Sequence, residues 1–169
     1  KDEKWVLRKH LPTRERLPYY SELYEKLLTD YKNNLKVTSK KISIIDLGAG
    51  VNGFSYRYLP KNTNYLGVEA VGQLVELMNN YFIREKIRHH SVQSDSSGSR
   101  INAKAIHESL FELDKIKKII IGTKKPRIIF LFKTLDSLEM LERDYSKKLL
   151  QEITPLADKV VVSFAMQSM

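Results

Sequence analysis

The chain has 169 residues, of which 42% are hydrophobic and 29% are charged. This length suits one domain with its own core, and the composition is that of a folded globular protein. No apolar run approaches the roughly 20 residues that cross a membrane, and the charged N-terminus is unlike a signal peptide. We therefore expect a single domain over residues 1–169, acting in the cytoplasm without a membrane partner.

Several kinds of site are excluded by composition. The chain has no cysteine, which rules out disulfides, thiolate zinc sites and a cysteine nucleophile. Its four histidines, His10, His89, His90 and His107, lack the spacing of metal ligands. We therefore expect no metal site.

The charge of the chain is strongly basic, with a formal net charge of +9 and a pI of about 9.6. Residues 1–45 hold eleven Lys/Arg against six Asp/Glu, and residues 84–127 hold eleven against five. Such a domain is attracted to nucleic acid, because neutralised phosphates release counterions. The alternative is a solvated lysine-rich surface that has no partner.

The N-terminal half predicts one helix, two strands and the start of a second helix. Residues 19–32 place apolar side chains three and four positions apart, which is typical of an amphipathic helix. Residues 42–47 form an apolar run that ends in a glycine cluster, as a buried parallel strand does. Residues 64–69 predict a strand ending in an acid, and a helical pattern runs on from Val71. The polar stretch 94–99 is a loop by composition.

The C-terminal half predicts three further strands. A weaker strand covers 103–107, and a helix follows between about 109 and 121. Residues 127–133 are the strongest strand of the chain. A helix at 135–152 then precedes a fifth strand at 159–164.

Strands that alternate with helices predict a doubly wound α/β fold with a mostly parallel sheet. We expect the strand order 3-2-1-4-5, with a helical segment over residues 1–40 ahead of an α/β core over 41–169. Ligands of such sheets bind outside the carboxyl ends of the strands, so the motifs at those ends form the candidate site.

A glycine loop follows the first predicted strand. Gly48, Gly50 and Gly53 spell G-x-G-x-x-G, which permits a tight turn and close approach of a ligand. Glu69 ends the next strand, where an acid can accept both ribose hydroxyls of an adenosine ligand. Asp46 stands two places before the first glycine, and an acid at this position is typical of the glycine loop of S-adenosylmethionine methyltransferases. The loop therefore favours S-adenosylmethionine over a dinucleotide or a plain structural turn.

Three further segments accompany the glycine loop. Residues 10–18 read HLPTRERLP, residues 130–139 read FLFKTLDSLE and residues 160–168 read VVVSFAMQS. In this order they make the chain resemble the aminoglycoside-resistance 16S rRNA methyltransferases, which modify guanine N7 in the decoding site. The resemblance implies a Rossmann-like methyltransferase fold, S-adenosylmethionine as cofactor, and ribosomal RNA or the small ribosomal subunit as partner.

The resemblance also assigns the methionine and ribose ends of the cofactor. An arginine of the TRER segment, Arg14 or Arg16, would hold the methionine carboxylate, although both could be plain surface charges. Glu69, followed by Ala70, would bind the ribose. The methionine pocket would be shaped by Asp46, Gly48, Ala49 and Gly50.

The remaining assignments concern the adenine and the reacting end. Glu108, followed by Ser109 and Leu110, would lie beside the adenine, although an acid at a helix N-terminus is also favoured by the helix dipole. Lys133 could simply extend to solvent from a strand end. The mouth of the methyl-transfer site would be lined by Lys133, Thr134 and Leu135.

The chain departs from the family at three places. The family's VSFPxRS segment lacks its proline and arginine here, because residues 165–167 are Ala-Met-Gln. The family's D-I-D after the second strand reads Val-Glu-Ala at 68–70. The chain also carries neither the family's helical docking domain nor the two strands that usually follow the fifth, so we expect a fragment or a reduced relative.

Guanine N7 has an available lone pair and needs no deprotonation. Catalysis would therefore consist of positioning, with an unstacked base held in line with the methyl donor. We expect a monomeric RNA methyltransferase. A small-molecule methyltransferase and a non-catalytic module that binds S-adenosylmethionine or RNA remain the alternatives.

Overall fold

The computed structural model describes the chain except residues 1–2, 10, 36–40, 61–62, 86–101 and 165–169. The predicted loop at 94–99 and the altered residues 165–167 lie outside the described residues. None of the described helices has the length and apolar character needed to span a membrane.

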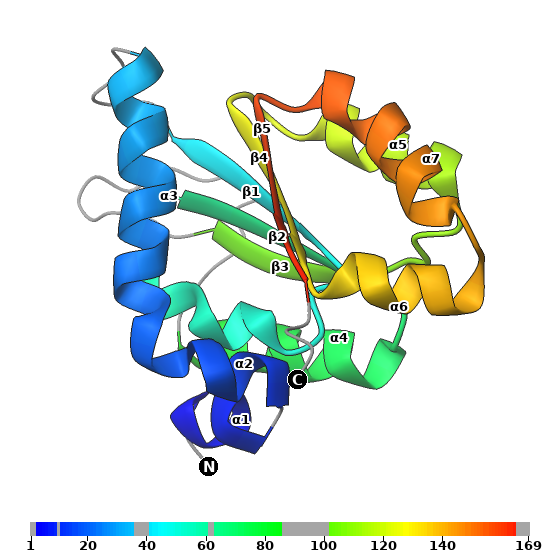
Figure 1. Cartoon of the computed structure of the whole chain (residues 1–169). Coiled ribbons are helices and arrows are strands. Elements are labelled where there is room, and N and C mark those ends of the chain that lie inside the picture. The colour runs from blue at the N-terminus through cyan, green and yellow to red at the C-terminus, as the bar shows by residue number, and fades with distance from the viewer. Residues whose placement is uncertain (1–2, 10, 36–40, 61–62, 86–101, 165–169) are drawn as a thin grey trace, which may run out of the picture.

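Five parallel strands form one sheet in the order β3-β2-β1-β4-β5 (Figure 1). This confirms the predicted fold class and strand order. The central strands β1 and β4 are buried along almost their whole length because helices cover both of their faces. The strands are β1 Ile42–Leu47, β2 Thr63–Glu69, β3 Asn102–His107, β4 Arg127–Phe132 and β5 Lys159–Ser163.

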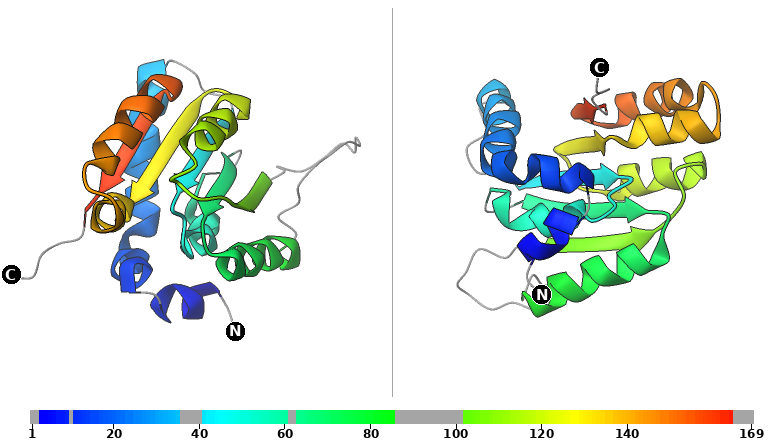
Figure 2. Two further views of the ribbon diagram at one scale, coloured as in Figure 1. Left: turned by 90° about the vertical axis from the view of Figure 1, so that its right-hand side faces the viewer. Right: turned by 60° about the horizontal axis from the view of Figure 1, so that its bottom comes forward.

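Helices lie on both faces of the sheet (Figure 2). One face carries an aromatic core in which Tyr24 of α3 stacks on Phe130 of β4, with ring centroids 6.0 Å apart. This face is covered by α1 Glu3–Lys9, α3 Tyr20–Leu35, the short helix η2 Asn52–Tyr58 and α4 Gly72–Arg84. The short elements α2 Leu11–Arg16 and η1 Leu17–Tyr19 lead from α1 into α3.

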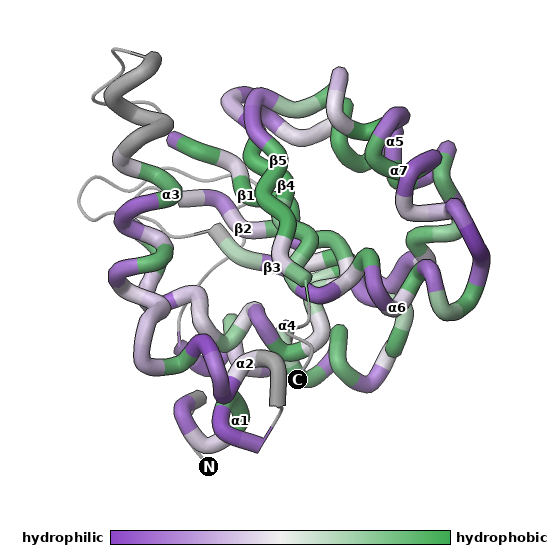
Figure 3. The backbone as a smooth tube through the Cα atoms, viewed as in Figure 1, coloured by the Kyte–Doolittle hydropathy of each residue, from purple (hydrophilic) through white to green (hydrophobic). Residues whose placement is uncertain are grey.

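The other face carries an aliphatic core. Ile45 and Leu47 of β1 and Ile129 of β4 are fully buried there. In Figure 3 these strands are mainly hydrophobic, whereas the covering helices alternate between the two colours. The covering elements are α5 Leu113–Gly122, α6 Thr134–Leu141, α7 Tyr145–Ile153 and η3 Thr154–Leu156.

The helix predicted at 135–152 is wrong as a single element, because it is two helices. Glu142 is extended and Asp144 is left-handed, with a φ of 62°, so the chain turns between α6 and α7. The Glu139 carboxylate accepts the backbone N–H groups of Asp144 and Ser146 at 2.9 and 2.8 Å, which holds this turn. The apolar spacing continues across the break and therefore concealed it.

Two further boundaries shift, and both shifts shape the site. The helix predicted from about 109 begins at Leu113, because residues 109–112 form a turn in which the Glu112 N–H donates to the Ser109 carbonyl at 3.1 Å. The strand predicted to reach 133 ends at Phe132, since Lys133 adopts a left-handed conformation with a φ of 58°. Ser109, Leu110, Phe111 and Lys133, which therefore lie outside the helix and the strand, line a cavity at the carboxyl ends of the strands.

Candidate functional site

A cavity of about 480 Å³ lies at the carboxyl ends of β1, β2 and β4. Its volume is within the usual range of small-molecule sites. It is enclosed by α2, the glycine loop, the end of β2, the turn before α5 and the first turns of α6. The lining residues are Thr13, Arg16, Gly48, Ala49, Gly50, Glu69, Ala70, Val71, Leu74, Ser109, Leu110, Phe111, Phe132, Lys133, Thr134, Ser137, Leu138 and Leu141.

The glycine loop forms the floor of this cavity. Gly48 and Gly50 have φ values of 72° and 53°, which glycine adopts without strain. A Cβ atom on Gly48 would lie 2.6 Å from Cγ2 of Thr134, so the loop passes directly against the start of α6. The Thr134 hydroxyl donates to the Leu47 carbonyl at 3.0 Å and holds this contact. Gly48, Ala49 and Gly50 all line the cavity, so the loop presents its backbone to a ligand there.

Glu69 stands at the end of β2, and its two carboxylate oxygens bond the glycine loop and the start of α4. Oε2 accepts the Gly50 N–H at 2.8 Å, and Oε1 accepts the Val71 N–H at 2.9 Å. An ionised carboxylate has about four acceptor positions, so each oxygen retains one for a further donor. Two spare acceptors beside the glycine loop suit the two hydroxyls of a ribose.

Asp46 lies beneath the cavity and does not line it, being 1% exposed. Strand alternation places it on the aromatic face of the sheet, where its Oδ2 accepts from Asn52 at 2.6 Å and from Tyr65 at 2.7 Å. Oδ1 has no hydrogen-bond partner in the described part of the chain. Burial raises the pKa of this carboxyl to about 6, while Asn52, Tyr65 and the charge of Arg16 oppose the rise.

This raised pKa predicts a pH dependence of stability. Between about pH 4 and pH 6 the folded protein binds more protons at Asp46 than the unfolded chain does. Protonation of Asp46 therefore makes its full contribution to the free energy of unfolding at low pH. The free energy of unfolding should lose it as the pH rises through about 6. Urea unfolding from pH 4 to 7 should show this fall in the parent and not in Asp46→Asn.

The control for this measurement is Asp114→Asn, at an exposed position in the first turn of α5. Glu139 and Glu152 have lowered pKa values, so their contributions are lost at acid pH in all three proteins. An unchanged profile in Asp46→Asn would contradict the assignment.

Arg16 lines the cavity, whereas Arg14 is exposed and does not. The Arg16 guanidinium lies over the Phe132 ring at 4.9 Å. Its Nε and one terminal nitrogen are buried and find no acceptor among the described residues. Buried N–H groups normally have partners, so this pair suits an anionic group of a ligand.

The turn before α5 brings Ser109, Leu110 and Phe111 to the cavity. Glu108 is not a lining residue; its carboxylate accepts the Ser109 N–H at 3.0 Å and pairs with Lys115 at 3.4 Å. Phe111 packs on Tyr145, with ring centroids 4.6 Å apart, and supplies an aromatic wall.

At the start of α6, Lys133 and Thr134 line the cavity and Leu135 does not. Leu135 is 3% exposed and belongs to the aliphatic core. The Lys133 ammonium is paired with the Glu15 carboxylate from α2, which lowers the pKa of Glu15. Because α6 is helical, Ser137, Leu138 and Leu141 of the same face reach the cavity in place of Leu135.

Several lining residues were missed by the sequence-based prediction: Thr13, Val71, Leu74, Phe111, Phe132, Ser137, Leu138 and Leu141. Most are apolar and indistinguishable from core positions in a sequence pattern. Phe132 was detectable, because it ends a strand at the ligand-binding edge. Within the described residues, no group of three or more His, Asp or Glu side chains could hold a metal ion.

No protein-family model matches the chain, and no curated protein matches it in sequence. Several solved structures are similar to it in fold. The 16S rRNA methylase ArmA is similar with a TM-score of 0.67 and 20% identity, over 100% of this chain and 71% of ArmA. The 16S rRNA methylase RmtB is similar with a TM-score of 0.57 and 19% identity, over 96% of this chain and 54% of RmtB.

The bifunctional kinase-methyltransferase WbdD is also similar, with a TM-score of 0.61 and 15% identity, over 90% of this chain and 29% of WbdD. Likeness at these identities shows a shared fold. The predicted resemblance to the 16S rRNA methyltransferases is thus confirmed for the fold. The chain spans only about half the length of RmtB. A bifunctional enzyme shares the fold, so the fold alone does not assign the substrate.

Proposed function

We propose that the chain binds S-adenosylmethionine in this cavity and transfers its methyl group to RNA, at a guanine N7 of small-subunit ribosomal RNA in the cytoplasm. The observation that carries the proposal is Glu69, a carboxylate at the end of β2 with two spare acceptor positions, which lines the cavity together with Gly48 and Gly50. S-adenosylmethionine supplies a methyl group on a positively charged sulfur.

The cavity has a complementary group for each part of this cofactor. Glu69 would accept the two ribose hydroxyls. Arg16 would donate to the methionine carboxylate the two N–H groups that have no partner in the described part of the chain. The turn from Ser109 to Phe111 offers an apolar and aromatic wall to the adenine. Asp46 would act through the position of Asn52 and the charge of Arg16, without touching the cofactor.

The chemistry of guanine N7 agrees with the side chains of the cavity. Its titratable lining residues are Arg16, Glu69 and Lys133. Arg16 and Glu69 are assigned to the cofactor, and Lys133 is paired with Glu15. Since N7 attacks through an existing lone pair, the residues need only hold base and donor in line.

The rim of the cavity suits an unstacked base. Leu141 is 75% exposed, Val71 46% and Phe111 36%, although all three line the cavity. An RNA base turned out of its stack needs apolar surfaces against which to pack. The net charge of +9 would favour an RNA partner.

The test is transfer of labelled methyl groups from S-adenosylmethionine to isolated small subunits and to naked 16S rRNA. We expect label in RNA, at a position that reductive cleavage specific for 7-methylguanosine reports. Label at a nucleotide resistant to this cleavage would overturn the N7 assignment. Binding of the cofactor without label in either RNA would favour a small-molecule methyltransferase or a binding module.

Exchanging Arg16 for lysine should weaken binding of the cofactor's carboxylate without affecting binding of its adenosine part. A lysine cannot form the two parallel hydrogen bonds of a guanidinium. We expect Arg16→Lys to bind S-adenosylmethionine about tenfold more weakly by calorimetry, and to bind adenosine as the parent does, since a charged hydrogen bond contributes about 1.5–3 kcal/mol.

Arg14→Lys is the matched control, because Arg14 lies two residues away and does not line the cavity. It should bind both ligands as the parent does. Equal weakening of both ligands in Arg16→Lys would show that Arg16 supports the cavity only as a structural side chain.

A further inference from the structure

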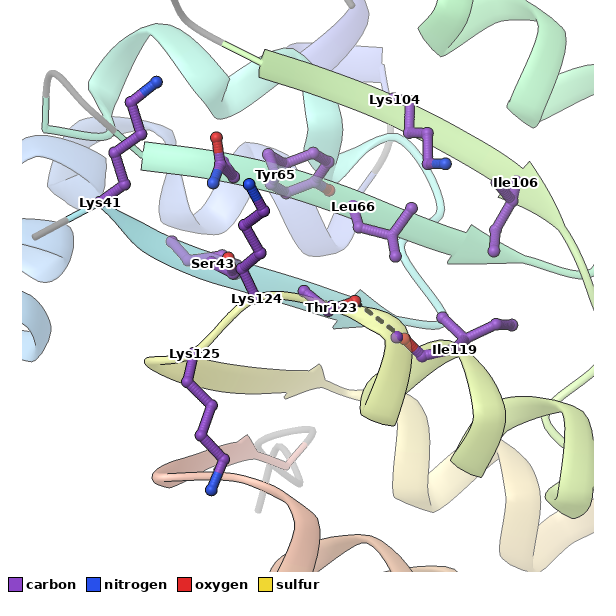
Figure 4. A pocket seen from close by; sticks show the side chains of 13 residues that line it. Lys41, Ser43, Tyr65, Leu66, Lys104, Ile106, Ile119, Thr123, Lys124 and Lys125 are labelled. Carbon is purple, nitrogen blue, oxygen red and sulfur yellow. Dashed lines mark hydrogen bonds between the residues drawn. The ribbon is translucent and has the colours of Figure 1, made fainter. Parts of the chain in front are cut away.

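A second cavity, of about 590 Å³, lies at the amino-terminal ends of the strands, away from the candidate cofactor site. It is formed over β1, β2 and β3 on the aliphatic face, next to the end of α5 and the turn at 123–125 (Figure 4). We call it the lysine groove, after its lining residues Lys41, Lys104, Lys124 and Lys125.

The groove exists because α5 leaves this corner of the sheet uncovered. Ile116 and Ile120 of α5 are fully buried, whereas Leu66, Ile106 and Ile119 at the groove are only partly buried. On the opposite face, α4 covers β2 and β3, and Asn79 bonds the backbone of Ala105 at 2.8 and 2.9 Å. The floor of the groove is therefore apolar and open.

The charged side chains known to line this floor are all positive. Among the residues that the structure describes, no Asp or Glu lines the groove. Within the described part of the chain, none of its four lysines forms an ion pair. Figure 4 shows Lys104 and Lys124 extending over β2, whereas Lys125 points away from the floor. Unpaired ammonium groups around a concave apolar surface fit a polyanion that also has apolar faces.

We propose that the lysine groove binds the backbone of the same RNA molecule whose base enters the cofactor cavity; this inference rests on the proposed function. Phosphates would meet Lys104 and Lys124, and sugars or bases would cover Leu66 and Ile106. A strand of β2's seven residues spans about 20 Å at ~3.3 Å per residue. One structured RNA can bridge this distance, so the groove is a second contact that fixes its orientation.

The experiment compares Lys104→Gln/Lys124→Gln with Lys118→Gln/Lys147→Gln. The control removes the same charge from exposed lysines that line neither cavity. The probe is a 16S rRNA transcript, titrated at several salt concentrations. Two lost phosphate contacts should weaken binding by roughly tenfold or more at about 0.1 M salt and lower the salt slope by about 2, while the control changes little.

A second readout does not depend on affinity. Acetylation of lysines, followed by mass spectrometry, should show Lys104 and Lys124 protected by the transcript and Lys118 and Lys147 modified as in the free protein. Thermal unfolding of both variants checks that they fold as the parent does. Equal loss in both variants, or groove lysines that stay unprotected, would overturn the proposal. Protection by polyglutamate but not by RNA would assign the groove to an acidic protein instead.

The outcomes also separate this inference from the proposed function. Suppose that the parent transfers methyl groups and that Lys104→Gln/Lys124→Gln binds RNA as the parent does. RNA binding by the groove would then be refuted, and the proposed function would stand. If the transcript protects the groove lysines selectively but the parent transfers no methyl group, RNA binding by the groove stands and the proposed function is refuted.

Discussion

Glu69→Ala is expected to weaken binding of S-adenosylmethionine by at least about tenfold, and by about a hundredfold if both ribose hydroxyls bond this carboxylate. Each charged hydrogen bond contributes about 1.5–3 kcal/mol. The same substitution removes the acceptors of the Gly50 and Val71 N–H groups, which tie the end of β2 to the glycine loop and to the start of α4. Calorimetric titration with S-adenosylmethionine and S-adenosylhomocysteine measures the effect.

The control for loop damage uses the ligand instead of the protein. The parent should bind adenosine more tightly than 2′,3′-dideoxyadenosine, and Glu69→Ala should bind the two alike. Glu76→Ala, an exposed glutamate on α4, should behave as the parent. If Glu69→Ala still discriminates between the two nucleosides, the ribose lies elsewhere.

Gly48→Ala is expected to abolish measurable binding of S-adenosylmethionine and to lower the unfolding temperature. A left-handed conformation costs an L-residue about 1–2 kcal/mol, which corresponds to about 2–8 °C in a domain of this size. The added Cβ would also lie 2.6 Å from Thr134 Cγ2, so the loop or α6 must move. Calorimetry and thermal unfolding measure the two effects.

Two variants separate the backbone strain of Gly48→Ala from its steric contact with Thr134. Thr134→Ala removes the two closest atoms but also the hydrogen bond to Leu47, so it serves as the reference. Gly48→Ala should cost less stability in the Thr134→Ala background than in the parent, because only the backbone strain and the milder contact with the Thr134 Cβ remain. Gly122→Ala, at the end of α5, adds a Cβ that meets nothing within 4 Å and should be neutral or slightly stabilising. A Gly48→Ala protein as stable as Gly122→Ala would show that the loop is not constrained as described.

The arrangement of strands and the place of the site were predictable because they follow from local rules. Apolar runs that alternate with helical patterns require parallel strands, and right-handed crossovers leave few strand orders. Gly48 follows the first strand and Glu69 ends the second, so both had to reach the carboxyl edge of the sheet. A sequence pattern is enough to bring those two residues together.

The direction of a side chain was harder to predict from the sequence, as Asp46 and the two arginines show. Asp46 is next to the loop in sequence, yet strand alternation directs it with Ile42 and Ile44 into the aromatic core. Arg14 and Arg16 differ by two positions, and residues so spaced on a helix do not share a face. The way in which α2 packs against the sheet decides which of them reaches the cavity.

The sequence by itself therefore determined the doubly wound sheet, its strand order and the glycine loop with its acid, because periodicity and chain connectivity act over short distances. Only the tertiary structure decided that Arg16 faces the cavity, that Phe111 replaces Glu108 as its wall, and that lysines of β3 and the turn after α5 share one groove. These depend on where a helix begins and how far it covers the sheet. Such features arise from packing between segments distant in sequence.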